Sequence, residues 1–308
     1  MKKILVTGGS GMTGKYLKEL LPDADYPTSS ELNLLDPVRT AAYIHSTTPD
    51  VVIHLAGVVG GILDNIERQI TFFENNLQMN FNLVRACRET KVPHLITALS
   101  TCTYPDNFDY IPGFLYPITE EYLHQGPPTR TNYGYGYAKR IMGVHVDVIN
   151  AANNNNNYCY LVPCNLFGEY DKYGDKNSHF ISALLKKIIV AQRENKSYIE
   201  LLGTGKPLRQ FMYAKDLARI IAQMVETETY VSMNVAPDGV KTIHELAQDT
   251  LKALGLNFEI KYSNALDGQY RKDASNVKLK STFPDFEFTS FEAAIQDTYR
   301  YLIENKIV

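Results

Sequence analysis

The stretch KKILVTGGSGMTGKYLKELL, residues 2–21, decides the fold of this protein. It opens with a short apolar run rich in β-branched residues and then reaches two glycines, a pattern typical of a buried strand that ends in a tight turn. Met12, Tyr16 and Leu20 then recur at helical spacing. The stretch therefore predicts a strand, a turn and a helix in direct succession.

Three glycines in this turn, Gly8, Gly11 and Gly14, indicate a dinucleotide site. The backbone of such a loop turns sharply, approaches a pyrophosphate closely and presents amides at the positive end of a helix. A glycine triplet alone is weak evidence, but its place between a strand and a helix makes it more specific. The predicted cofactor contacts in this loop are Gly8, Gly9, Ser10, Gly11, Met12, Thr13 and Gly14.

Strands and helices continue to alternate beyond this stretch. Residues 50–57, 94–100 and 158–168 are apolar strand candidates, and helical patterns over 72–90 and about 135–152 separate them. Such alternation predicts an α/β fold, a Rossmann-type doubly wound parallel sheet with helices on both faces.

The pattern of elements changes in the last part of the chain, from about residue 178. Amphipathic helices at 178–195, 242–255 and 290–305 predict a smaller mixed α/β substrate lobe. We expect an NADP-binding Rossmann domain over 1–165 and about 208–235, and a substrate-binding lobe over about 166–207 and 236–308.

Composition excludes several classes of protein. The 308 residues are 44% hydrophobic and 21% charged, with a formal net charge of -3, so no basic field favours nucleic acid. No run approaches the roughly 18 apolar residues of a membrane helix, and the start of the chain shows no signal-peptide core. The four cysteines form no metal-binding pair. We expect a cytoplasmic protein that binds no metal, nucleic acid or membrane.

The sequence favours NADPH as the dinucleotide. NAD sites usually place an acidic residue about 20 positions after the glycines, at the end of the second strand, whereas Ser29 and Ser30 stand at the expected end of that strand in this chain. Hydroxyl groups accommodate a 2′-phosphate, and Lys15 could reach it. Asp36 has two interpretations, a contact with the adenine or a cap on the helix that begins at Pro37.

A tyrosine and a lysine carry the predicted chemistry. Tyr135 and Lys139 are four residues apart and share one face of a helix, so the ammonium could lower the phenol's pKa and hold the nicotinamide ribose. Ser100, at the end of a strand, would donate to the same substrate oxygen. Such a pair is common by chance, and an exposed helix pair is the alternative; the glycine turn makes the combination more specific.

Several blocks resemble the extended short-chain dehydrogenase/reductase family and, within it, the GDP-L-fucose synthase family. They are GVVGGILDNI (57–66), STCTYP (100–105), NYGYGYAKR (132–140), NLFGEYDKYGDKNSHFISALLKK (165–187) and LLGTGKPLRQFMYAKDLA (201–218). The resemblance implies a homodimer that epimerises C3 and C5 of GDP-4-keto-6-deoxy-D-mannose and then reduces C4 with NADPH. The family commonly has tryptophan where this chain has Leu202, and proline where it has Glu169.

The resemblance also implies roles for single residues. Cys102 would be the base and His179 the acid of epimerisation, while Ser100 and Tyr135 stabilise the C4 oxygen and Lys139 assists Tyr135. Read alone, Cys102 would be a buried structural residue and His179 a packing residue. Further cofactor contacts would be Lys139, Pro163, Asn165 and His179. Substrate contacts would be Asn165, Lys187, Leu202, Arg209, Asp267 and Lys272.

Two other functions remain open at this point. One is an epimerase/reductase for another 4-keto-6-deoxy nucleotide sugar, such as a colitose precursor, because a cysteine and a histidine do not define how many carbons invert. The other is a non-catalytic sensor that binds a dinucleotide and a protein. Ser100, Tyr135 and Lys139 argue against the sensor, which has no need of them.

Overall fold

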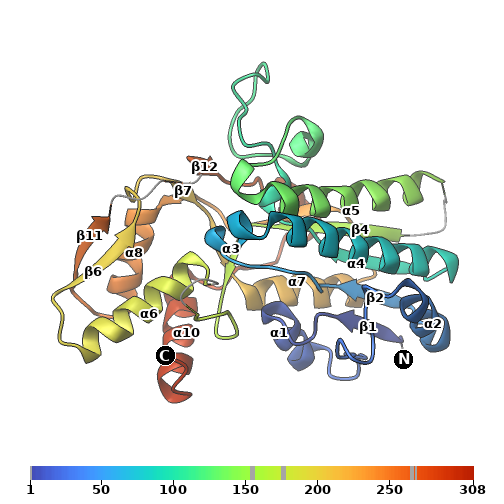
Figure 1. The fold of residues 1–308 in the computed structure, drawn as a ribbon, viewed down its shortest axis with the longest axis horizontal. Helices are drawn as coiled ribbons and strands as arrows, with labels where there is room; N and C mark the ends of the chain where they lie inside the picture. Colours follow the sequence, from blue (N-terminus) through green and yellow to red (C-terminus); the bar gives the residue numbers. More distant parts are fainter. Residues whose placement is uncertain (1, 153–156, 175–177, 264–266, 268) are drawn as a thin grey trace.

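The computed structural model describes residues 2–152, 157–174, 178–263, 267 and 269–308. Its larger lobe is built on a parallel sheet in the order β1-β2-β3-β4-β9 (Figure 1). The strands are β1 (Ile4–Thr7), β2 (Val51–His54), β3 (His94–Ala98), β4 (Asn157–Pro163) and β9 (Met233–Val235).

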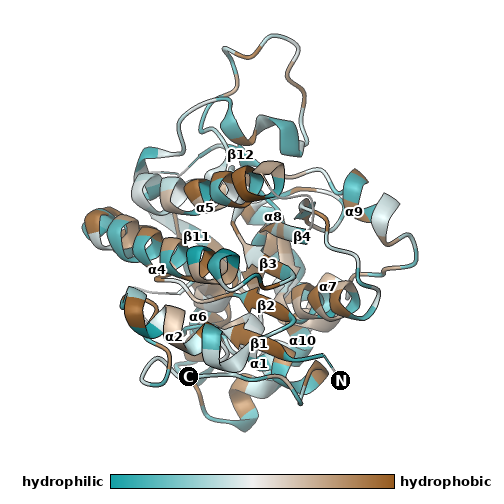
Figure 2. Ribbon diagram, turned by 90° about the vertical axis from the view of Figure 1, so that its right-hand side faces the viewer, coloured by the Kyte–Doolittle hydropathy of each residue, from teal (hydrophilic) through white to brown (hydrophobic). Residues whose placement is uncertain are grey.

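The strands of this sheet are apolar on both sides because helices cover both faces. Leu5 and Val52 belong to the cluster of buried residues that includes the helices α2, α4 and α5, whereas their neighbours Val6 and Ile53 pack with α1 and α7. Figure 2 shows α2, α4 and α5 on one side of the sheet and α7 on the other. The bounds of these helices are α1 (Met12–Leu20), α2 (Pro37–Thr47), α4 (Gln69–Glu89), α5 (Tyr133–Ala152) and α7 (Ala214–Glu226).

The smaller lobe surrounds short strands with three helices, α6, α8 and α10 (Figure 1). β6 and β11 pair in parallel, β7 lies between β10 and β12, and β5 pairs with β8. The elements are α6 (Phe180–Arg193), α8 (Ile243–Ala253), α10 (Phe291–Glu304), β5 (Asn165–Phe167), β6 (Tyr198–Leu202), β7 (Leu208–Arg209), β8 (Phe211–Tyr213), β10 (Lys241–Thr242), β11 (Glu259–Ser263) and β12 (Arg271–Lys272). Shorter helices are α3 (Ile62–Glu67), α9 (Val277–Thr282), η1 (Thr101–Thr103), η2 (Glu120–His124) and η3 (Arg130–Asn132).

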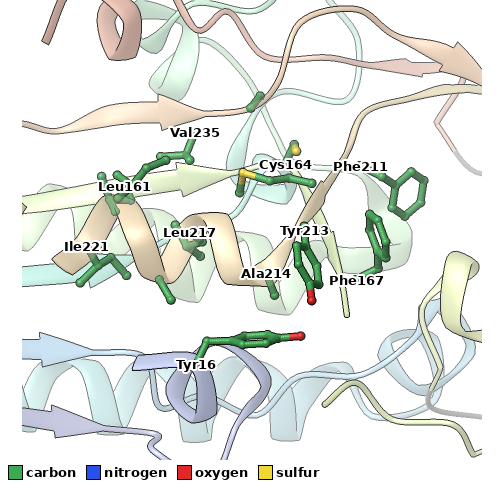
Figure 3. Packing of buried hydrophobic residues seen from close by; sticks show 14 of the residues in the cluster. Tyr16, Leu161, Cys164, Phe167, Phe211, Tyr213, Ala214, Leu217, Ile221 and Val235 are labelled. Carbon is green, nitrogen blue, oxygen red and sulfur yellow. The ribbon is translucent and has the colours of Figure 1, made fainter. Parts of the chain in front are cut away.

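A carboxylate links α1 to the loop after β5. The hydroxyls of Tyr16 and Tyr213, which point toward one another in Figure 3, both hydrogen-bond to Glu169. The Glu169 amide in turn donates to the Tyr16 hydroxyl over 3.1 Å. Glu169 therefore joins the helix behind the glycine turn to the loop after β5.

The strands and helices expected from the sequence form, with three differences. The strand expected before Ser29 is reduced to one bridge, Leu5↔Asp25, because Pro27 has no amide hydrogen for a ladder. The run 158–168 divides into β4 and β5, which pair in different sheets. The long helix α5 begins at Tyr133, two residues before the expected start. Within the described part of the chain, no helix is long and apolar enough to cross a membrane.

Candidate active site

The glycine turn connects the end of β1 to the start of α1. Gly8 has a φ of 78°, and a Cβ there would lie 2.6 Å from the Ala56 nitrogen, so the turn packs directly on the end of β2. A Cβ on Gly14 would lie 2.3 Å from the Gly8 oxygen. α1 begins beside this turn, its N-cap Gly11 offers no side-chain acceptor, and its first turn holds no acidic residue. The open backbone cradle and the free helix terminus fit a dinucleotide pyrophosphate.

The residues expected near the adenosine occupy an exposed turn. Ser29 and Ser30 are exposed, and the Ser30 hydroxyl lies 2.8 Å from that of Thr28. Asp36 caps α2, because its Oδ1 accepts from the amides of Val38 and Arg39 over 2.9 and 3.0 Å. The capping interpretation of Asp36 therefore holds in the structure. Ser29 and Ser30 remain available to a 2′-phosphate.

Tyr135 and Lys139 lie on α5 beside the end of β3. Lys139 is buried, its Nζ donates to the Ala98 carbonyl over 2.8 Å, and burial lowers its pKa to about 8. Burial raises the pKa of Tyr135, and the charge of Cys102 raises it further. The expected lowering of this pKa by Lys139 is absent from the structure, because the ammonium is directed at a backbone carbonyl.

A buried histidine supports Lys139. His54 ends β2; its ring nitrogens lie 2.7 Å from the Thr7 hydroxyl and 2.9 Å from Asn80 Oδ1. Burial first, and then the charge of Lys139, lower the pKa of His54 to about 3. The ring is therefore neutral, which avoids a second buried cation next to Lys139.

Cys102 lies in η1, directly after β3. Its amide donates to the Ser100 hydroxyl oxygen over 3.2 Å, and the Ser100 hydroxyl also hydrogen-bonds to the Cys102 side chain. Asn132 Nδ2 and Lys272 Nζ each lie 3.2 Å from the Cys102 sulfur. Burial alone would raise the pKa of Cys102, but the Lys272 charge and these hydrogen bonds outweigh it, and the pKa is lowered.

His179 is the N-cap of α6 and faces a buried carboxylate. Its Nδ1 lies 2.9 and 3.1 Å from the two oxygens of Asp171, which also hydrogen-bond to Ser182. Burial opposes the imidazolium, but Asp171 and the charge of Cys102 favour it, and the pKa of His179 is raised. Cys102 and His179 therefore have pKa values moved toward each other, which favours a thiolate and an imidazolium at neutral pH.

Two of the predicted substrate residues, Lys272 and Arg209, interact with Cys102, and a third, Asp267, interacts with Arg209. Lys272 contacts the sulfur directly. Burial lowers the pKa of Arg209, while the charges of Cys102 and Asp267 act to raise it. Arg209 donates to the carbonyls of Leu208, Gln269 and Tyr270. Asp267 accepts from the Thr204 amide over 2.9 Å.

The other predicted residues lie farther along the lobe or serve the backbone. Lys187 Nζ donates to the Glu200 carbonyl over 2.6 Å, and Leu202 is 65% exposed at the end of β6. Asn165 donates to the Gln210 carbonyl over 2.8 Å, and Pro163 ends β4 beside Val235. The structure shows no direct contact from these side chains to Cys102 or His179 within its described residues.

Sequence reasoning missed the residues that support the reacting groups. Asn132 and Asp171 lie inside the quoted family blocks, but their sequence spacing to Cys102 and His179 does not reveal contact. His54 reads as an ordinary strand residue. The sequence signal for Asn132 and Asp171 is a short polar residue within a block of candidate catalytic residues. Such residues are too common for this signal to identify a supporting role.

These contacts define the class of protein as a dinucleotide-dependent oxidoreductase, because a tyrosine and a lysine lie at the same edge of the sheet as the glycine turn that would hold a cofactor. The chain belongs to the NAD dependent epimerase/dehydratase family, whose model matches residues 4–236.

Sequences and solved structures of known proteins resemble this chain over nearly its whole length. The chain is 37% identical over 325 residues to a probable GDP-L-fucose synthase of Drosophila melanogaster, covering 99% of this chain and 98% of that protein. It is 34% identical to a GDP-L-colitose synthase of Yersinia pseudotuberculosis over 99% of both chains. A GDP-L-fucose synthetase of Naegleria fowleri bound to NADP superimposes with a TM-score of 0.87 at 32% identity, over 100% of this chain and 94% of that one.

Proposed function

We propose that this protein converts GDP-4-keto-6-deoxy-D-mannose to GDP-L-fucose by epimerising C3 and C5 and reducing C4 with NADPH. One observation carries the proposal. The helix of Tyr135 packs on the segment of Cys102, because a Cβ on the neighbouring Gly136 would lie 2.6 Å from the Cys102 carbonyl oxygen. After burial, which raises the pKa of Tyr135 and acts to lower that of His179, the charge of Cys102 acts to raise both pKa values. A base, an acid and a donor at the ketone oxygen are the groups that this reaction needs.

The epimerisation uses the acidity of hydrogens beside a ketone. The Cys102 thiolate removes the proton from C3 or C5, and the electrons move onto the C4 oxygen as an enolate. Ser100 and Tyr135 donate to that oxygen, and removal of a proton by Cys102 releases the Ser100 hydroxyl from its bond to the thiolate. His179 returns a proton to the opposite face of the carbon, which inverts it.

The reduction needs a proton donor beside the ketone. NADPH, when bound in the cradle of Gly8, Gly11 and Gly14, supplies the hydride for C4. The raised pKa of Tyr135 keeps its phenol protonated until it donates to the C4 oxygen. Lys139 carries its charge below about pH 8 and stabilises the tyrosinate left behind.

The nucleotide sugar would extend from this centre into the smaller lobe. Arg209 and Lys187 are the cations proposed for the diphosphate, with Asp267 near the nucleotide. We retain the proposed division into a Rossmann domain over 1–165 and about 208–235, and a substrate lobe over the remainder, except that β7 and β8 pair with strands of the smaller lobe and are grouped with it. A cleft between lobes is a common location for such a ligand.

A second nucleotide sugar is an alternative substrate and is included in the test. The 34% identity to a GDP-L-colitose synthase supports another 4-keto-6-deoxy nucleotide sugar as the alternative. Both reactions use a base, an acid and a reductant, so the contacts around Cys102 do not separate them.

We also propose that the protein is a homodimer of the cytoplasm. The outer sides of α4 and α5 expose apolar side chains that a second copy could cover: Ile70, Phe81, Ile141, Val144 and Val148. The four cysteines are free thiols, and a reducing compartment preserves such thiols.

The test is turnover of GDP-4-keto-6-deoxy-D-mannose with NADPH in deuterated water. Loss of NADPH absorbance, with deuterium at both C3 and C5 of a GDP-L-fucose product, supports the proposal. NADPH loss without deuterium would leave a plain ketoreductase, and turnover only of the colitose precursor would establish the alternative. NADPH binding without any turnover would favour a sensor.

A further inference from the structure

We infer that Lys272 and Asn132 are positioning residues that hold Cys102 as a thiolate, with Lys272 as its counter-ion. This inference deepens the proposed function, on which it rests for the role of Cys102 as the epimerisation base. It assigns Lys272 a role different from the expected contact with the substrate.

The sulfur of Cys102 receives two nitrogen donors from separate segments. The Lys272 ammonium comes from β12 in the smaller lobe, and the Asn132 amide comes from η3, just before α5; each lies 3.2 Å from Sγ. A thiolate accepts such charge-assisted hydrogen bonds much better than a neutral thiol does. Two converging donors therefore favour the anionic sulfur and restrict its direction.

The Asn132 amide is oriented for an acceptor. Its nitrogen faces the sulfur, while its Oδ1 is buried with no hydrogen-bond partner among the described residues. A neutral thiol could donate to that oxygen if the amide were reversed. The observed orientation leaves a buried oxygen unpaired, a costly arrangement that a thiolate explains because it needs the N–H group.

Lys272 has no carboxylate partner in the described residues. It is 8% exposed, and the adjacent carboxylate, Asp273, is engaged by Arg271 over 2.7 and 3.0 Å. A buried ammonium requires a compensating anion, since desolvation of an unpaired charge is expensive. The Cys102 thiolate is the group in contact that can supply it.

The other titratable groups around Cys102 are consistent with this pairing. Alongside burial, the charge of Cys102 acts to raise the pKa values of His179, Tyr135 and Arg209. The Arg209 guanidinium donates to backbone carbonyls. Arg209 and the His179 imidazolium favour the thiolate from a distance. Lys272 and Asn132 hydrogen-bond to the sulfur through nitrogen, and the Ser100 hydroxyl adds a third side-chain hydrogen bond to it.

The experiment measures the thiol itself and needs no sugar substrate. Alkylation of the Cys102 peptide by iodoacetamide is followed by mass spectrometry across pH in wild type, Lys272→Met, Lys272→Arg and Asn132→Asp. The exposed Lys278→Met is the matched control for the loss of one positive charge. Cys87, Cys159 and Cys164 are buried, so they react slowly and are resolved as separate peptides.

We expect the midpoint of alkylation to move to higher pH in Lys272→Met and Asn132→Asp, with a rate at pH 7 reduced at least about threefold. Lys272→Arg should restore most of the wild-type profile, and Lys278→Met should match it. An unchanged midpoint in both Lys272→Met and Asn132→Asp would overturn the inference. NADP⁺ affinity and circular dichroism identify the variants that fold. If Lys272→Met does not fold, the alkylation profile of Asn132→Asp tests the inference.

The reaction supplies a second readout that separates this inference from the proposed function. In Lys272→Met, deuterium incorporation should move to higher pH, while the wild type remains active. If the wild type turned over no keto sugar, the alkylation profile would still decide the state of Cys102. A fully active wild type with an unshifted Lys272→Met profile would leave the function intact and refute the inference.

Discussion

The imidazole of His179 lies against the carboxylate of Asp171, with Nδ1 2.9 Å from Oδ1 and 3.1 Å from Oδ2. Asp171 is buried at its side chain and also hydrogen-bonds to Ser182 of α6. The contact orients the ring so that the other nitrogen, Nε2, is directed away from the carboxylate and can act on a ligand. A carboxylate thus supports the proposed acid in the same way that a lysine supports the proposed base.

Asp171→Asn should weaken epimerisation most strongly at alkaline pH. Asp171 holds the pKa of His179 above its usual value, so the variant should lose the imidazolium at lower pH. We expect deuterium incorporation at pH 8 to fall about tenfold or more, with a smaller loss at pH 6. NADP⁺ affinity is the control, and a loss independent of pH would contradict the assignment.

The same contact has a consequence for stability. A raised pKa in the folded state means that the His179 contribution is fully present below the unfolded pKa and lost as pH rises through the folded one. Urea denaturation of wild type and Asp171→Asn should therefore differ more at pH 5.5 than at pH 9. Equal differences at both pH values would show that Asp171 does not act through the proton of His179.

Lys139→Met should stabilise the fold while it abolishes reduction. Burial lowers the pKa of Lys139 from 10.5 to about 8, so its proton costs the folded state roughly 3 kcal/mol at neutral pH. We expect a gain of ~1–3 kcal/mol in the free energy of unfolding at pH 7. The gain should shrink between pH 8 and 10, where the wild-type lysine loses its proton on folding. A destabilised variant would show instead that the bond to Ala98 outweighs the cost of burial.

Alanine at two of the glycines should separate binding from folding. On Gly14 a Cβ would lie 2.3 Å from a backbone oxygen, whereas on Gly11 the closest atom is 3.2 Å away. Gly14→Ala should lose about 2–3 kcal/mol of stability. Gly11→Ala should fold within about 1 kcal/mol of wild type yet bind NADPH at least about tenfold more weakly, because its methyl group enters the pyrophosphate cradle. Thermal unfolding and fluorescence titration measure the two effects.

Val148→Asp should dissociate the proposed dimer. Val148 is 60% exposed on the outer side of α5, near Val144 and Ile141. A buried carboxylate repeated by the two-fold axis should raise the dimer dissociation constant at least about tenfold. Light scattering after gel filtration measures the mass, with Ile307→Asp, beyond α10, as the control for an exposed apolar residue. A wild type that is monomeric at micromolar concentration would refute the dimer.

The local pattern of apolar and polar residues was sufficient to predict much of the fold. The run from Lys2 to Leu21 predicts β1, the turn and α1 because strand and helix periodicities are properties of neighbouring residues. The same reasoning predicts β2, β3, β4 and the long helices α4 and α5, but not the short edge strand β9. It was wrong about the strand before Ser29, where a single proline prevents the ladder.

The chemical groups were also visible in the sequence, but their partners were not. Tyr135 and Lys139 share a helix, so their spacing determines that they lie on one face. Cys102 and Lys272 are separated by 170 residues, and Asp171 reaches His179 across a loop whose path no periodicity describes. The contact between Cys102 and Lys272 exists only after the two lobes pack together, and that between Asp171 and His179 only after their own lobe has folded. The sequence by itself therefore determined which groups could react, whereas the tertiary structure decided their protonation, because burial and opposite charge act through distance in space and not along the chain.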